Sequence, residues 1–166
     1  MRFLKLFLLA WLAVFIQSSL SGLLSVWGLV PDFIAMVIGL TALTLGIGPG
    51  IQIGVMAGFM ADCYHPSTMG LFTLSGAVSG YWAGALRERI YKDHLSSQLL
   101  IVGFLSLVRQ LFEYWGRGGG GLGGYFSVLM RFGLGSAVYT LLLGVLLLPY
   151  LKRFLSKSEK SKLNLA

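Results

Sequence analysis

The chain carries no charged residue between Asp32 and Asp62, and this gap constrains the fold more than any other feature. The uncharged stretch is largely apolar and is interrupted once, by the sequence Gly-Ile-Gly-Pro-Gly at residues 46–50. Proline lacks a backbone N–H and glycine disfavours helix interiors, so a break there costs little. The stretch therefore predicts either one overlong membrane helix or two shorter helices folded into a hairpin.

The composition favours a polytopic membrane protein. Hydrophobic residues make up 56% of the 166 residues and charged residues only 11%, whereas soluble domains contain about a quarter charged residues. The single cysteine, Cys63, excludes an intramolecular disulfide and a cysteine-based zinc cage. The net charge of +7 could indicate nucleic acid, but the placement of the basic residues argues for a membrane surface instead.

Six segments have the apolarity of membrane helices, two of them shorter than the usual span of roughly 20 residues. Pro31 is expected at the entrance of the second, and Ser67 or Thr68 is expected to cap the fourth. The glycine-rich residues 116–124 are predicted to form a flexible external loop. The predicted spans are residues 3–20, 30–45, 50–61, 69–86, 96–114 and 126–151.

The positions of lysine and arginine favour six spans over five, because these residues concentrate in cytoplasmic loops. A five-span chain, with the second and third segments merged, would place basic residues on the wrong side. With six spans and both termini inside, only Arg117 among the loop and terminal basic residues lies outside. The cytoplasmic set is Arg2, Lys5, Arg87, Arg89, Lys92, Lys152, Arg153, Lys157, Lys160 and Lys162.

We therefore predict an all-α fold, with a six-helix transmembrane domain over residues 1–151 and a basic cytoplasmic tail over 152–166. The tail has too little apolar content to fold and could contact anionic lipid headgroups. One alternative concerns the first segment, whose basic start and apolar run resemble a secretory signal peptide. Its cleavage would leave five spans with the same orientation.

Small residues line one face of the third segment. Gly50, Gly54 and Gly58 are spaced four apart, and Ala57 and Ala61 add small residues at the same interval. On a helix this spacing makes a smooth groove that another backbone can approach closely. Two interpretations stay open, packing within the bundle and docking of a partner helix, with Asp62 as a candidate for polar contacts to that partner.

Three charged residues are predicted to lie within or near the membrane, where charges are costly. Arg109 and Glu113 are four residues apart in the fifth segment and could pair on one helix face. Arg131 in the sixth lies at a similar predicted depth and could join them or reach Asp62. The cluster is expected to be a clamp between helices or an outward-facing site for an anionic or zwitterionic ligand.

Residues that carry catalysis or bind metals are not grouped in this sequence. Asp62 and His65 leave a tetrahedral metal site two ligands short, and His94 is predicted on the other side of the membrane. Asp62 is instead expected to accept N–H bonds from the turn or from the start of the fourth helix. No nucleophile, base and orienting group occur together, so neither an enzyme nor a cofactor is expected.

Several motifs, in this order and spacing, resemble the family of the rod shape-determining protein MreD. They open the second span, close the third, and run through the fourth, and they cover residues 31–89 best. The motifs are Pro31-Asp32-Phe33, the Gly58-Phe59-Met60-Ala61-Asp62 run, Gly70-Leu71 with Leu74, and Gly80-Tyr81-Trp82-Ala83-Gly84-Ala85-Leu86 followed by Arg87.

The resemblance implies a non-enzymatic inner-membrane component of the bacterial elongation machinery, which makes peptidoglycan. Its implied partner is the single-span protein MreC, and through it the MreB filament and the RodA/penicillin-binding synthase pair. The family's fold is similar to the substrate-binding subunits of energy-coupling-factor transporters, so a small-molecule-binding transporter subunit is the alternative. Those subunits often carry Ala-x-x-x-Ala in the first helix, whereas Ala10 and Ala13 are three apart here.

Overall fold

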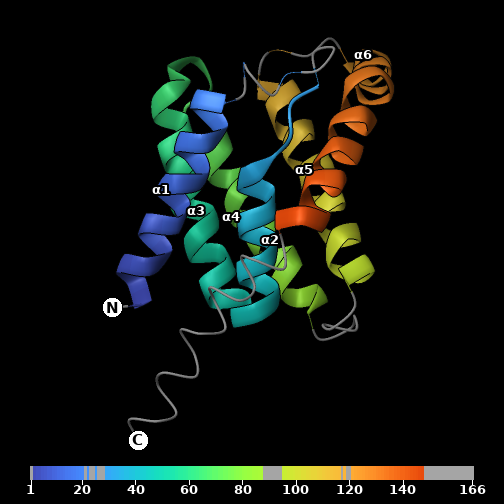
Figure 1. The fold of residues 1–166 in the computed structure, drawn as a ribbon. Helices are drawn as coiled ribbons and strands as arrows, with labels where there is room; N and C mark the ends of the chain where they lie inside the picture. The colour runs from blue at the N-terminus through green and yellow to red at the C-terminus, as the bar shows by residue number, and fades with distance from the viewer. Residues whose placement is uncertain are drawn as a thin grey trace, which may run out of the picture.

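The computed structural model describes residues 2–20, 22, 25, 29–87, 95–116, 118 and 121–147, which form helices and no β-strand (Figure 1). The predicted all-α fold is confirmed. A 3-10 turn, Pro66–Thr68, joins α3 to α4, and α6 continues through a π-helical turn, Leu129–Gly133, into a helix over Leu134–Leu147. The six helices are α1 Arg2–Leu20, α2 Phe33–Leu45, α3 Ile47–Tyr64, α4 Leu71–Leu86, α5 Leu95–Gly116 and α6 Gly121–Val128.

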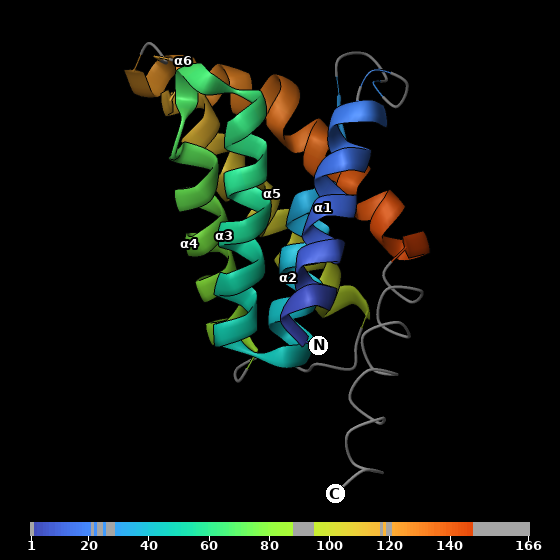
Figure 2. The ribbon, with the colours of Figure 1, turned by 90° about the vertical axis from the view of Figure 1, so that its left-hand side faces the viewer.

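Helices α1 to α5 run alternately up and down, so that each is antiparallel to the one before it, and the helix Leu134–Leu147 descends obliquely beside them (Figures 1 and 2). Helix α2 is central and contacts α1, α3, α4 and α5. One part of the core joins α1, α2 and α3, and includes Ala10, Ile38 and Ile53. A second part joins α2, α4 and α5, and includes Ala83 and Leu105.

The predicted break after the second segment is present but narrower than expected. Only Gly46 leaves the helical conformation, with φ at 99°, which glycine adopts readily. Helix α3 starts at Ile47 rather than at Gly50, because Pro49 fits the first turn of a helix, where its missing N–H would have no partner in any case. The two segments are separate helices, so the alternative of one kinked span is wrong.

The starts of two further helices differ from the sequence prediction. Helix α4 starts at Leu71, and Ser67 and Thr68 belong to the preceding 3-10 turn rather than capping it. Helix α6 starts at Gly121, inside the segment predicted as a loop over 116–124. Residues 148–151 of the predicted sixth span and the basic tail over 152–166 lie outside the described residues.

The described residues place apolar side chains outside and several polar ones inside. Large apolar side chains are exposed on α1, α3, α4, α5 and the helix Leu134–Leu147. Leu100 on α5 is 71% exposed and Leu142 is 67% exposed, whereas Ser79, Ser106 and Thr140 are fully buried. A soluble bundle has the opposite pattern, and large exposed apolar surfaces mark contact with protein or lipid.

Helix length supports membrane crossing for fewer helices than the exposed apolar side chains do. Within the described residues, one helix, Ser96–Gly116, is long and apolar enough to cross a membrane by length and composition alone. Three shorter helices are also apolar, namely Phe3–Ser19, Phe33–Leu45 and Leu134–Leu147.

The closest packing in the bundle joins α3 to α4, which lie side by side in Figure 2. A Cβ atom placed on Gly54 would lie closer than 3.0 Å to the carbonyl group of Gly76, and one on Gly76 would meet Gly54 in the same way. Gly50 and Gly80 form a second reciprocal contact of this kind. Backbone therefore touches backbone along the hairpin, and only glycine fits at these positions.

The α3–α4 contact predicts opposite effects for two glycines of the same helix. Gly54→Ala should lower the free energy of unfolding by about 1–3 kcal/mol, because the added methyl group forces the two helices apart. Gly48→Ala is the matched control, since a Cβ at Gly48 meets nothing within 4 Å and alanine favours helix. Denaturant titration of both variants in detergent compares them. Equal stability of the two would contradict the backbone contact.

Candidate functional site

Two carboxylates lie at the same end of the bundle, the buried Asp62 at the end of α3 and the partly buried Asp32 at the start of α2. Asp62 is 2% exposed and accepts hydrogen bonds from the first turn of α4. Its Oδ1 accepts from the N–H of Phe72 at 3.1 Å, and its Oδ2 accepts from the N–H of Thr73 at 3.0 Å. The Thr73 hydroxyl also donates to Oδ2.

Asp62 therefore caps α4 from the neighbouring helix. The first N–H groups of a helix have no intrahelical acceptor, and a carboxylate there also suits the positive end of the helix dipole. The sequence prediction that Asp62 accepts N–H bonds at the start of the fourth helix is confirmed. The bonds hold the α3–α4 turn closed at the end where the glycine contacts begin.

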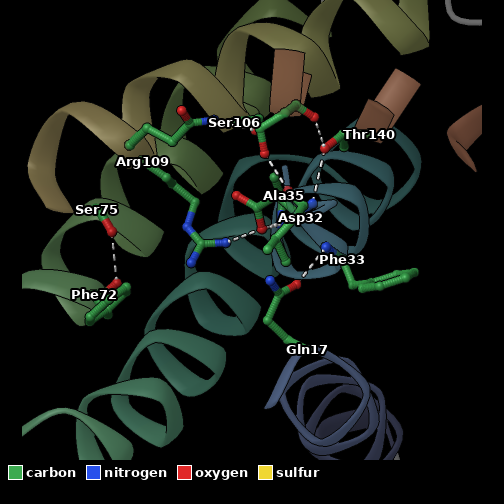
Figure 3. A network of polar contacts seen from close by, with 12 residues as sticks. Gln17, Asp32, Phe33, Ala35, Phe72, Ser75, Ser106, Arg109 and Thr140 are labelled. Atoms are coloured by element: carbon green, nitrogen blue, oxygen red, sulfur yellow. Dashed lines mark hydrogen bonds and ion pairs between the residues drawn. The ribbon is translucent and has the colours of Figure 1, made fainter. Parts of the chain in front are cut away.

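Asp32 is the N-cap of α2 and forms an ion pair with Arg109 of α5. Its Oδ1 accepts from the N–H of Ala35 at 2.9 Å and from Nη1 of Arg109 at 2.7 Å (Figure 3). Both side chains are largely buried, with 15% and 8% of their surfaces exposed. One carboxylate thus satisfies the start of α2 and neutralises the arginine.

Two further donors at the start of α2 bond to side chains from two other helices (Figure 3). The N–H of Asp32 donates to the hydroxyl of Thr140, and the N–H of Phe33 donates to Oε1 of Gln17 on α1, both at 2.9 Å. The Ser136 hydroxyl donates to the carbonyl of Val30, just before this point. Side chains of α1, α5 and the helix Leu134–Leu147 therefore meet at the start of α2.

A buried ion pair of this kind orders the bundle more than it stabilises it. Desolvation of both charges offsets much of their attraction, whereas removing one partner leaves a buried charge uncompensated. Arg109 is 7% exposed, and its Nε atom has no hydrogen-bond partner in the described part of the chain. The pair joins the start of α2 to α5.

The structure changes the predicted partner of Arg109. The sequence analysis paired it with Glu113 on the same helix, whereas the ion pair is made with Asp32. Geometry explains the difference, because Asp32 sits where the positive end of α2 already favours a carboxylate. Glu113 is half-buried, and the side chain of Arg131 lies outside the described residues, so the three-residue cluster stays a prediction.

Sequence analysis missed four members of this network. Asp32 was identified only as a family motif residue, and none of Gln17, Ser136 and Thr140 was singled out. The available signal was polar side chains inside apolar segments, which need partners in a membrane. The partners themselves are far apart in the sequence, 77 residues for Asp32 and Arg109 and 108 for Asp32 and Thr140.

The small-residue face of α3 packs inside the bundle. Gly50 and Gly54 contact α4 glycines, and a Cβ on Gly58 would overlap the backbone of Phe72. Of the two open interpretations, packing within the bundle is the one that the structure has. These three glycines are buried and cannot also receive a partner helix.

Two of the other motif residues, Gly70 and Gly84, belong to the same hairpin, and a third, Pro31, precedes α2. Gly70 precedes α4 with φ at 93°, a left-handed conformation that favours glycine. A Cβ on Gly84 would overlap the backbone of Ile47 at the far end of the α3–α4 contact. Pro31 is buried next to the α2 cap. The family-motif residues therefore lie mainly at helix starts and at close contacts between helices.

The opposite side of α3 is exposed and is called the outer α3 face. It consists of Gly48, Gln52, Val55 and Phe59, spaced three or four residues apart along one side of the helix. Phe59 is 56% exposed and Val55 is 39% exposed. Gln52 is exposed, and its side chain makes no hydrogen bond to any other described residue.

The described residues contain no group of three or more His, Cys, Asp and Glu side chains that could hold a metal ion.

A family model described as rod shape-determining protein MreD matches residues 1–157, which confirms the resemblance and extends it beyond residues 31–89. No curated protein matches the chain. No solved structure matches it either.

The ion pair predicts a non-additive pair of substitutions. Asp32→Asn keeps an N-cap side chain but leaves Arg109 buried without a counter-charge, so the free energy of unfolding should fall by about 3–5 kcal/mol. Adding Arg109→Gln should recover part of this loss. A double-mutant cycle from denaturant titrations measures the coupling. Purely additive effects would show that the two charges do not interact.

Proposed function

The chain belongs to the MreD family of rod shape-determining proteins, and from that premise we propose that it binds the membrane helix of a single-span, MreC-like protein. Membership of the family implies a non-enzymatic membrane protein with a role in rod shape. In the proposed role the chain is an adaptor of the cell-elongation machinery in the bacterial inner membrane. It connects indirectly, through the MreC-like partner, to the MreB filament and the RodA/penicillin-binding synthase pair.

The proposal includes a topology with six membrane-spanning helices and both termini in the cytoplasm. Two observations support it: the alternating directions of the helices and the predominance of basic residues on one side of the six-span chain. In this orientation the Asp32–Arg109 pair and the Asp62 cap lie at the external end. The apolar outer surfaces of the helices then face lipid.

The outer α3 face is the proposed contact for the partner helix. The exposure of the polar Gln52 side chain on this face is the main support for that choice. An exposed amide surrounded by apolar residues on a membrane helix lacks water to bind. Glutamine side chains form hydrogen bonds across membrane helices, and small residues let backbones approach. Gly48 provides such a small residue, with open space around it.

The outer α3 face differs from the glycine face of the same helix, because the glycine face is already packed inside the bundle. Gly50, Gly54 and Gly58 are committed to α4, so the opposite side of α3 is the side of this helix that remains. The hairpin is also rigid, because α3 and α4 touch through their backbones and Asp62 closes the turn. A rigid helix presents a fixed row of side chains to a partner.

The proposed contact predicts that Phe59→Ala reduces recovery of the MreC-like partner by about tenfold. This corresponds to about 1.4 kcal/mol, a modest value for loss of one aromatic contact. Phe104→Ala on α5 is the matched control, because Phe104 is 48% exposed and lies on another helix. Co-purification from detergent-solubilised membranes gives the measurement. In a rod-shaped bacterium, Phe59→Ala should also yield round cells on replacement of the wild-type chain.

Equal partner recovery with both variants would contradict the proposed face while leaving the family assignment intact. A loss with Phe104→Ala alone would move the contact to α5. Protein levels of both variants are measured in parallel, so that loss of folded protein is distinguished from loss of binding.

A further inference from the structure

An apolar groove of about 500 Å³ opens between α1, α2 and the end of the helix Leu134–Leu147. Its volume lies in the range of sites that bind small molecules. Phe33, Met36 and Val37 of α2 form its floor together with one side of α1, and Leu147 closes it on the other side. Among the described residues, Lys5 in the first turn of α1 is the one charged residue that lines it.

The groove has the depth of one leaflet of a bilayer. Its α1 wall extends from Lys5 to Ile16, and eleven helical steps correspond to about 16 Å. The hydrocarbon core of a bilayer is about 30 Å thick, so one leaflet is about 15 Å deep. A membrane helix of a partner protein would need a groove of roughly twice this length, whereas an acyl chain needs only one leaflet.

Lys5 marks one end of the groove as polar. Lysine side chains near helix ends extend their amines to the headgroup region, where they attract anionic lipids. The other lining residues, such as Leu12 and Ala13, offer only apolar contact. The groove is therefore complementary to a phospholipid: Lys5 can bind a negative headgroup at one end, and the apolar lining can hold a hydrocarbon chain below it.

We propose that this groove binds an anionic phospholipid, with one acyl chain between α1 and α2 and the headgroup phosphate beside Lys5. In the proposed topology Lys5 lies at the cytoplasmic end of α1, so the lipid belongs to the cytoplasmic leaflet. That assignment depends on the topology, whereas the groove and its depth do not. The bound chain fills the space between α1 and the end of the helix Leu134–Leu147. It thus joins two parts of the bundle that Figure 2 shows diverging.

The test uses the full-length protein reconstituted in vesicles with equal amounts of phosphatidylglycerol and phosphatidylcholine. After gentle extraction, native mass spectrometry measures the lipid that each protein molecule retains. The wild-type protein should retain one phospholipid, with phosphatidylglycerol preferred by about fivefold for a single lysine at the surface. Lys5→Gln should abolish this preference, and Lys5→Arg should keep it.

Leu12→Trp tests the acyl-chain site separately. Leu12 lines the groove and is 51% exposed, so the larger ring can enter the groove without disturbing the core. This variant should lose the retained lipid, whereas Leu142→Trp, on an exposed position away from the groove, should keep it. Thermal unfolding verifies that both variants are folded.

Three results would overturn the proposal. Retention of the same lipid by Leu12→Trp would place it elsewhere on the protein, and an unchanged headgroup preference in Lys5→Gln would exclude Lys5. Displacement of the lipid by the single-span partner would assign the groove to a protein helix instead. The groove variants leave the outer α3 face unchanged, and their recovery of the single-span partner is measured in the same samples. Loss of lipid binding can therefore be distinguished from loss of the proposed adaptor function.

Discussion

Backbone contact between α3 and α4 is the constraint on which the rest of the bundle depends. Gly54 and Gly76 approach so closely that neither position has room for a Cβ atom. In lipid, where apolar burial adds little to helix association, such close contact is a main source of stability. It fixes the hairpin as one rigid unit, against which α1, α2 and α5 pack: α1 contacts α3, α5 contacts α4, and α2 contacts both.

The polar side chains inside the bundle join helices to one another through hydrogen bonds and an ion pair. Asp62 closes the α3–α4 turn, and Asp32 joins the start of α2 to α5 through Arg109. Both carboxylates satisfy helix starts, where backbone N–H groups would otherwise lack acceptors. Their location inside an apolar shell explains how a chain with few charges holds its helices in one arrangement. It requires no catalytic role for either residue.

Sequence patterns predicted the number of helices and the small-residue face, because apolar runs and four-residue spacing are local signals. They also predicted that Asp62 caps the fourth helix, since acceptor and donors lie close in the sequence. The pairing of Asp32 with Arg109 was not predicted. It depends on how α2 and α5 pack, and a local rule favoured the nearer Glu113. The sequence likewise left open which side of α3 faces inward.

The central claim is that α3 presents one face to α4 and the opposite face to a single-span partner. Photo-cross-linking groups placed singly along α3 in living cells measure this directly. Adducts with the partner should form at Gln52, Val55 and Phe59 and be absent at Ile53 and Ala57, which are buried. Adducts from none of the exposed positions, together with adducts from α5 at Leu100, would contradict the account.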